Sequence, residues 1–372
     1  MTALAAEPVA GVRFTPEQRA AVEDRGGSAL LAANAGSGKT AVMVERFVEA
    51  VLQDGVAVGS ILALTFTEKA AGELRERVRR RFTELGELER AREAEAAWIG
   101  TIHGFCARIL RARPLAAGLD PRFTVLDEQA ARRLAERAYE DALEAWAAAG
   151  GAAALDLAAA YGPGLRDIVL AVHESLRSRG QGRPRLPIPP PPPAPDPSDL
   201  AAARAAAAAA LATAAYGKKV AAAREALDAC ERFAGAGVVP WPGDLDVAKL
   251  VTGAKALEHP ACADYREAWE AYRASCADVH AREALVVLDG LLDRFGAAFD
   301  VAKAERAAVD FSDLELRVRD LLEDPAARRG WAERFELIMV DEFQDTNRLQ
   351  LDILEALERD NLFAVGDEFQ SI

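Results

Sequence analysis

Two segments far apart in this chain carry residue types that together could hold and hydrolyse a nucleotide. The first, AANAGSGKT from Ala32 to Thr40, is a glycine-rich turn that enters a helix, so it presents backbone N–H groups and a positive helix end to phosphates. The second, LIMVDEFQDTN from Leu337 to Asn347, is an apolar strand followed by carboxylates, which suit Mg²⁺ binding and the activation of water. Together the two segments predict an ATPase.

The glycine-rich segment fits the phosphate-loop pattern GxxxxGK(S/T) except at its first position, where Ala33 replaces glycine. Its glycines permit backbone conformations that side chains would block, so successive N–H groups can face a β-phosphate. Lys39 is expected to bridge the β- and γ-phosphate oxygens, and the Thr40 hydroxyl to bind magnesium. The alternative is a glycine turn with a solvated lysine. The predicted nucleotide contacts in the loop are Ala35, Gly36, Ser37, Gly38, Lys39 and Thr40.

The acidic pair Asp341 and Glu342 follows a strand of apolar residues, and ligands of open α/β sheets bind at the carboxyl ends of the strands. Asp341 is expected to hold magnesium, and Glu342 to act as the general base for the attacking water. Taken alone, such a pair is more often a helix cap or a surface turn. With the phosphate loop present, we predict that Lys39, Asp341 and Glu342 converge, and that the strands carrying them are neighbours in one sheet.

Strand-like and helix-like segments alternate at both ends of the chain, which is typical of a parallel sheet with crossover helices. The sequence therefore predicts an α/β fold with helices on both faces of the sheet. The apolar periodicities predict strands at residues 28–33, 61–66, 98–101, 336–340 and 362–365, and helices at residues 38–52, from 68 onward, 103–113 and 348–357.

The middle of the chain is different, because alanine, leucine, glutamate and arginine dominate and strand signals nearly vanish. We predict a split motor domain (residues 1–113 and 308–372) interrupted by an all-helical inserted subdomain (residues 114–307). The proline run within residues 183–197 cannot be helix or central strand, so it is expected to be an extended linker or loop. A recognition motif for a proline-binding partner is the alternative reading of that run.

Composition narrows the class of protein. The 372 residues, with 51% hydrophobic positions, can bury at least one full core. No run of about 20 apolar residues indicates a membrane span, so a cytoplasmic protein is expected. Four scattered cysteines, without a CxxC pair, argue against a zinc ribbon or a disulfide framework.

The net charge of −14 disfavours binding to nucleic acid, but the stretch Lys69–Arg81 is locally basic. This stretch is either a DNA-contact face or an ordinary solvated helix.

Beyond a generic ATPase, the chain resembles the UvrD/RecB group of superfamily-one DNA helicases. The spellings TFTEKAA, TIHGFC and DEFQDTN are closer to the AddA and RecB branch than to UvrD itself. Resemblance is strong over both ends and weak over the helical insert. The segments that carry it, besides the two above, are FTPEQRAAV (14–22), ALTFTEKAAGELRERV (63–78), GTIHGFCARIL (100–110), FTVLDE (123–128), DFSDL (310–314) and VGDEFQSI (365–372).

This resemblance implies roles for particular residues and a RecA-like fold for the motor domain. Gln18 matches a glutamine that contacts adenine, and Gln370 one that senses the γ-phosphate. Several positions have a structural alternative: Gln18 could lie on an exposed helix, Phe66 in the core, His103 in the core or at a cap, and Asp310 with Asp313 at a helix cap. The residues implied to contact single-stranded DNA are Thr65, Phe66, Thr67, Thr101 and His103.

The resemblance further implies an ATP- and Mg²⁺-dependent DNA helicase with 3′ to 5′ polarity, acting in recombination and double-strand break repair. Its partners would be single-stranded and duplex DNA and a partner subunit of a helicase–nuclease complex. The sequence ends inside the last motif, so we expect a fragment that does not unwind DNA alone. The alternatives are a non-catalytic DNA- or partner-binding module and a P-loop ATPase of another purpose.

Overall fold

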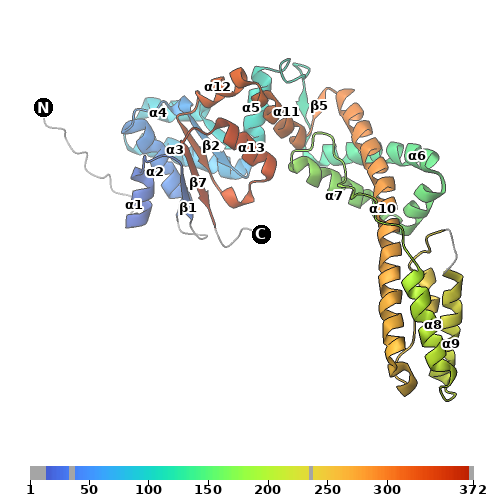
Figure 1. Ribbon diagram of the computed structural model, residues 1–372. Coiled ribbons are helices and arrows are strands. Elements are labelled where there is room, and N and C mark those ends of the chain that lie inside the picture. The colour runs from blue at the N-terminus through green and yellow to red at the C-terminus, as the bar shows by residue number, and fades with distance from the viewer. Residues whose placement is uncertain (1–13, 33–37, 234–237, 368–372) are drawn as a thin grey trace. The chain divides into compact units, whose positions relative to one another are not determined.

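A five-stranded parallel sheet forms the centre of the α/β part of this protein (Figure 1). The computed structural model describes residues 14–32, 38–233 and 238–367. All strand pairs in the sheet are parallel, in the order β1-β7-β6-β2-β3. The strands are β1 (Ala29–Ala32), β2 (Ile61–Thr65), β3 (Trp98–Thr101), β6 (Leu337–Val340) and β7 (Leu362–Gly366). The predicted parallel α/β fold is therefore confirmed.

Helices cover both faces of this sheet because alternate strand residues point to opposite sides. Leu62 and Leu64 of β2 pack in one core, whereas Ile61 and Ala63 pack in another. The first core includes residues of α5 (Ile102–Ala112), α11 (Phe311–Glu323), α12 (Pro325–Ala332) and α13 (Arg348–Leu357). The second includes residues of α1 (Pro16–Glu23), α2 (Lys39–Leu52), α3 (Glu68–Glu84) and α4 (Leu88–Glu93).

Short polar side chains fix where the helices after the strands begin. Thr67 accepts a hydrogen bond from the Ala70 N–H at the start of α3, and Thr101 accepts one from the Gly104 N–H at the start of α5. Asn347 and Gln350 form a reciprocal capping box at the start of α13. These caps place the first turns of three helices at the carboxyl ends of β2, β3 and β6, the edge where ligands of such sheets bind.

The described residues fold into two compact units. The first comprises the chain up to Asp141, then Arg166–Pro184, and the chain from Gly296 onward. The second comprises Ala142–Leu165 and Arg185–Phe295. The remaining elements are α6 (Glu128–Tyr161), α7 (Gly164–Ser178), α8 (Ser198–Ala212), α9 (Lys218–Cys230), α10 (Pro260–Ala304), and a small parallel pair of strands, β4 (Thr124–Val125) with β5 (Ala308–Val309). The predicted division at residues 114 and 307 stays a prediction.

The second unit is helical and has its own core, in which Tyr265, Trp269 and Leu211 are almost completely buried. Residues 184–197 form neither helix nor strand, as their prolines predict. This segment is held to α10 by Asp289, whose carboxylate accepts hydrogen bonds from the Arg185 guanidinium and the Leu186 N–H. The proline-rich segment is thus anchored to its own unit at its first residues.

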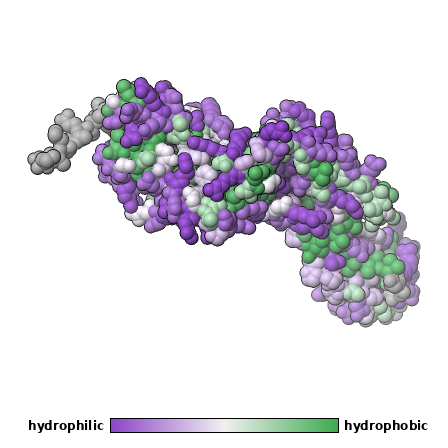
Figure 2. All heavy atoms as spheres, turned by 90° about the horizontal axis from the view of Figure 1, so that it is seen from above, coloured by the Kyte–Doolittle hydropathy of each residue, from purple (hydrophilic) through white to green (hydrophobic). Residues whose placement is uncertain are grey.

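The surface seen in Figure 2 is mostly hydrophilic, with smaller apolar patches between the polar side chains. No helix in the described parts of the chain is both long and apolar enough to cross a membrane. All four cysteines are buried free thiols, in line with the expectation that the chain has no disulfide framework.

A buried histidine predicts how stability depends on pH. His173 of α7 is 4% exposed, and its pKa is lowered to about 3, first by burial and then by the positive charges of Arg177 and Lys303. An unfolded chain would bind this proton below pH 6.5, so stability is present above that pH and is lost as pH falls toward 3. We expect a loss of about 3 kcal/mol between pH 6.5 and 4 from this group.

Urea unfolding between pH 4 and 7 would measure this loss. In a His173→Gln variant, the free energy of unfolding should fall less steeply with decreasing pH than in the unmodified chain. The exposed His259→Gln variant is the control and should keep the original slope. Equal slopes for the His173→Gln variant and the unmodified chain would contradict the assignment.

Candidate nucleotide and DNA site

Lys39 and Glu342 meet at the carboxyl edge of the sheet. Lys39 is the first residue of α2, and its Nζ lies 2.9 Å from Glu342 Oε2. The lysine side chain is only 10% exposed. The predicted convergence of Lys39 with the acidic pair is therefore confirmed at Glu342.

The expectation that the two strands are direct neighbours is wrong, because β7 lies between β1 and β6. Neighbouring strands are about 4.8 Å apart, so β1 and β6 are separated by roughly 10 Å. Lys39 is not on β1 itself but at the start of α2, and its side chain reaches Glu342 from there. A common sheet edge, with one strand in between, is sufficient to bring the ammonium to the carboxylate.

The acidic pair has an unusual local backbone. Glu342 adopts the left-handed conformation, with φ of 50°, which costs energy for a residue other than glycine. The Glu342 N–H donates to Asp341 Oδ1 at 3.1 Å, and Gln344 Nε2 donates to Glu342 Oε2 at 2.9 Å. The strained turn therefore aims both carboxylates from one strand end, with Gln344 holding Glu342 beside Lys39.

The two carboxyl groups have opposite pKa shifts. Burial, and then the negative charge of Glu342, raises the pKa of Asp341. For Glu342, burial acts to raise the pKa, but hydrogen bonds from Gln344 and Lys39 outweigh it and lower the value. The hydrogen bonds from Gln344 and Lys39 thus favour the ionised form of Glu342, which is the form that the predicted general base needs. For Asp341, burial penalises the ionised form, and a cation beside this carboxylate would stabilise that form.

The residues of the loop itself are only partly described. Ala35, Gly36, Ser37 and Gln370 lie outside the described residues. Gly38 has φ of 83° and precedes α2, so a side chain there would be strained. A Cβ at Gly38 would lie 3.2 Å from Gln18 Nε2, which places the predicted adenine-contacting glutamine beside the loop. Thr40, half-buried in the first turn of α2, follows Lys39 directly.

Gln18 also has a structural role, because its side chain and that of Thr15 form the capping box of α1. Its Oε1 accepts a hydrogen bond from the Thr15 N–H at 2.8 Å. Gln18 thus lies on a helix, as the structural alternative expects, and its side chain also lies beside the loop.

The oxygen ligands at this site suit Mg²⁺ that arrives bound to a nucleotide better than Mg²⁺ that is held by protein side chains alone. The described residues contain no group of three or more His, Cys, Asp or Glu side chains that could hold a metal. Magnesium commonly uses one or two protein oxygens together with substrate phosphates and water. Thr40 and the desolvated Asp341 are such oxygens, so the residues present suit a metal delivered with the triphosphate.

Three of the predicted DNA contacts are threonines with structural hydrogen bonds. Thr65, 5% exposed, donates to the Thr67 carbonyl at 3.1 Å. Thr101, 6% exposed, donates to Glu68 Oε1 at 2.6 Å, and Thr67 and Thr101 also cap helices as described above. Their side chains shape the two turns, and any contact with DNA by Thr65 or Thr101 is restricted by burial.

The aromatic residues of the same turns are more accessible. Phe66 is 61% exposed, and the side chain of His103 is 35% exposed. Both line a cavity of about 340 Å³ whose wall also includes Asp341 and Glu342. The predicted DNA-contacting rings and the predicted catalytic carboxylates thus share one cavity.

Sequence reasoning missed three residues of this cavity. Phe311 stacks on the His103 ring, with centroids 4.6 Å apart, and Glu315 and Gln350 lie beside it. The sequence pattern around Phe311 drew attention only to its flanking aspartates. The spacing of Phe311 and Glu315, one helical turn apart, was the signal that could have shown them on one face.

The basic stretch Lys69–Arg81 behaves as an ordinary surface helix. Arg75 donates to the Ile99 carbonyl in β3, which is a structural contact. The neighbouring arginines each pair with a glutamate: Arg77 with Glu73, Arg79 with Glu76, Arg80 with Glu84, and Arg81 with Glu45 and Glu84. Such pairs offset the local positive charge, so of the two readings the solvated helix is favoured.

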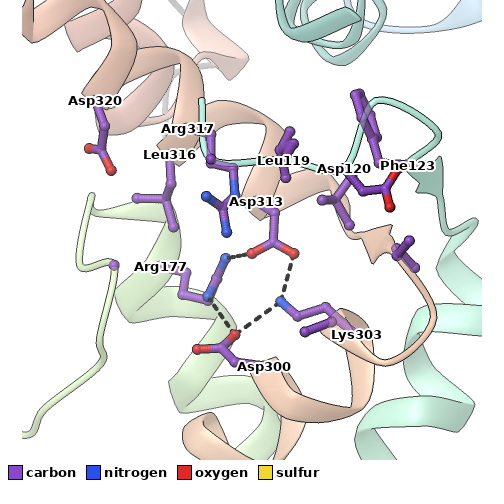
Figure 3. Close-up of a pocket in the computed structure, with 16 residues that line it drawn as sticks. Leu119, Asp120, Phe123, Arg177, Asp300, Lys303, Asp313, Leu316, Arg317 and Asp320 are labelled. Atoms are coloured by element: carbon purple, nitrogen blue, oxygen red, sulfur yellow. Dashed lines mark hydrogen bonds and ion pairs between the residues drawn. The ribbon is translucent and has the colours of Figure 1, made fainter. Parts of the chain in front are cut away.

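The aspartates of the DFSDL segment cap α11 and hold a buried ion cluster. Asp310 and Asp313 form the capping box of α11. Lys303 Nζ lies 2.9 Å from Asp310. It also lies 2.7 Å from Asp313, which pairs with Arg177 as well (Figure 3). Burial acts to raise the pKa of Asp313, but the two cations outweigh it and lower the value. This cluster lines a cavity of about 490 Å³ and ties α7 and α10 to α11.

Comparison with known proteins agrees with this geometry. Residues 14–372 match the UvrD/REP helicase N-terminal domain. Proteins named as ATP-dependent helicase/nuclease subunits are similar: 31% identical in Pelotomaculum thermopropionicum, over 96% of this chain and 34% of the relative; and 30% identical in Geobacillus thermodenitrificans, over 98% and 35%. The chain spans about a third of the length of these relatives. With its RecA-like sheet and this match along nearly all of its length, the chain belongs to the UvrD/REP helicase family.

Proposed function

We propose that this chain is the ATP-binding motor portion of an ATP-dependent DNA helicase with 3′ to 5′ polarity, acting in DNA recombination and double-strand break repair. The observation that carries the proposal is the cavity shared by Phe66, His103, Asp341 and Glu342, with Lys39 paired to Glu342 at its edge. A motor needs its hydrolysis site and its DNA grip in mechanical contact. The residues proposed for the two roles line one cavity, which supports this proposal.

In this proposal the chain's own residues divide the work of hydrolysis. Lys39 would leave Glu342 and bind the β- and γ-phosphates, while Thr40 and Asp341 would hold Mg²⁺, which would neutralise phosphate charge. Glu342, released from the lysine and still held by Gln344, orients and deprotonates the attacking water. Gln18 reads the base, and Gln370 senses the γ-phosphate. The loop residues Ala35, Gly36, Ser37 and Gly38 donate backbone N–H groups.

The chain alone is expected to bind Mg-ATP weakly and not to unwind DNA. No described arginine forms an ion pair with Asp341 or Glu342. Phosphoryl transfer in such motors uses an arginine from across the cleft, worth roughly 10³ to 10⁵ in rate. We propose that a second motor domain supplies it, and that the whole protein works with a partner, because the relatives are named as subunits.

Two measurements test the proposal. Titration of the chain with a fluorescent ATP analogue, with and without Mg²⁺, should show metal-dependent binding. The whole protein that carries this domain should unwind duplex DNA with a 3′ single-stranded tail, and not one with a 5′ tail. Unchanged unwinding by a whole protein that lacks the Lys39 ammonium would favour the alternative, a DNA- or partner-binding module.

Removing the exposed ring of Phe66 should weaken binding of single-stranded DNA. A base stacked on an aromatic side chain is worth about 1–3 kcal/mol, so a Phe66→Ala variant should lose roughly 5- to 100-fold in affinity for oligo-dT. The similarly exposed Leu88→Ala is the control, because Leu88 does not line the cavity. Fluorescence anisotropy with labelled oligo-dT would measure both. Equal affinities of the Phe66→Ala and unmodified chains would remove Phe66 from the DNA site.

A further inference from the structure

Glu315 is a buried carboxylate that joins three helices. It lies within α11 and is 3% exposed. His103 Nε2 lies 2.9 Å from its Oε1, and Gln350 Nε2 donates to the same oxygen at 2.7 Å. His103 belongs to α5 and Gln350 to α13, so one oxygen connects the helix after β3 with the helix after the acidic pair. None of the roles proposed above uses Glu315.

The same helix holds the His103 ring from two directions. Phe311, one turn before Glu315, stacks on the ring with an interplanar angle of 24°. Because Glu315 accepts from Nε2, that nitrogen carries a hydrogen whether the ring is neutral or protonated. In the neutral ring Nδ1 is then left as an acceptor. Stacking on one face and a charge-assisted hydrogen bond at one edge therefore fix both the tautomer and the rotamer.

The base of α11 is itself fixed. Its first turn is held by the buried ions of Figure 3, where Asp313 pairs with Arg177 and Lys303. Because α11 is fixed, the side-chain contacts between the acidic pair and the DNA-facing turn can rearrange more easily than α11 can move. Gln350 also caps α13 through its pairing with Asn347, and it lines the same cavity as Asp341 and Glu342.

We propose that Glu315 is a positioning residue: it orients His103 for single-stranded DNA and, through Gln350, makes that orientation respond to nucleotide at the acidic pair. The inference rests on the proposed function, because it takes the nucleotide and DNA sites as assigned there. A plain structural role, in which Glu315 merely satisfies two buried donors, would affect stability and leave the response of His103 to nucleotide unchanged.

Nuclear magnetic resonance of the imidazole nitrogens tests the first part directly. The chain has four histidines, so its ¹⁵N-histidine spectrum is simple, and a His103→Gln variant identifies the signals of His103. We expect the Nε2–H tautomer in the unmodified chain, and a shift of these signals when Mg²⁺ with the non-hydrolysable analogue AMP-PNP is added. The Nδ1–H tautomer, or no shift although the analogue binds, would overturn the proposal.

Variants of Gln350 and Glu315 separate two effects: the orientation of His103, and the response of that orientation to nucleotide. Gln350→Met has a similar size but no donor, so it should keep the Nε2–H tautomer and lose the response of His103 to nucleotide. Glu315→Leu should lose both, and should lower affinity for oligo-dT about tenfold. Glu315→Gln keeps an acceptor oxygen and should restore most of that affinity. The matched control is the exposed Glu323→Gln on the same helix, which should behave as the unmodified chain.

A double-variant comparison guards against a folding defect in Glu315→Leu. If Glu315 acts through His103, the loss of oligo-dT affinity in Glu315→Leu with His103→Gln together should equal the loss in His103→Gln alone. Additive losses would overturn the proposal. Failure of the unmodified chain to bind AMP-PNP would contradict the proposed function and this inference with it. Normal AMP-PNP binding without any change in the His103 signals would contradict this inference and leave the proposed function standing.

Discussion

A Lys39→Ala variant of this chain is expected to lose about 100-fold in affinity for Mg-ATP. The lysine side chain is 10% exposed and paired with Glu342, so its ammonium is positioned at the carboxyl edge of the sheet. A charge-assisted contact with phosphate of this kind is worth about 2–3 kcal/mol, which is on the order of 100-fold. Loss of the lysine also leaves the two carboxylates facing the triphosphate without a fixed positive charge.

Titration with a fluorescent ATP analogue would measure this loss, and the melting temperature would show that the fold is kept. The exposed Lys255→Ala variant is the matched control, since it removes a lysine from the second unit. Its affinity for nucleotide should be unchanged. An unchanged affinity of the Lys39→Ala chain would separate the glycine-rich turn from nucleotide binding and remove the basis of the proposed function.

A Glu342→Gln variant of the whole protein is expected to bind ATP and hydrolyse it about 10³-fold more slowly. General base catalysis contributes roughly 10² to 10⁴ in rate, and a glutamine cannot accept the proton from water. The amide keeps the size of the side chain and an acceptor for Gln344 or Lys39. Removing the negative charge that faces the γ-phosphate should leave nucleotide affinity equal or higher.

Single-turnover hydrolysis and equilibrium binding would separate these two effects. The exposed Glu333→Gln variant makes the same chemical change outside the cavity and should hydrolyse ATP at the normal rate. A Glu342→Gln protein with normal hydrolysis would assign the base to another group. Loss of binding together with hydrolysis would instead make Glu342 a structural partner of Lys39.

The local elements were largely predictable from the sequence. The strand Trp98–Thr101 and the helix Arg348–Leu357 have the bounds that their apolar patterns predicted, and the other strands of the sheet differ by a residue or two. Side-chain periodicity and capping residues are local properties, so they can be read without knowing the tertiary fold. The meeting of Lys39 with the acidic pair was also predictable, because parallel strands present their carboxyl ends at one edge.

What could not be predicted was which strands lie side by side and which polar side chains are buried. Nothing local in β1, β6 or β7 specifies that β7 inserts between the other two. The threonines at residues 65 and 101 were expected to face DNA, but packing buries them and engages their hydroxyls within the turns.

The sequence by itself determined which chemical groups this protein carries: a lysine after a glycine-rich turn, two carboxylates after an apolar strand, and aromatic residues in the turns between strand and helix. The tertiary structure alone decided that Glu315, distant in sequence from both partners, holds His103 and Gln350 with one oxygen. The physical reason is that a buried carboxylate must find donors wherever the packed helices present them. Such partners are set by the three-dimensional packing and leave no local pattern in the chain.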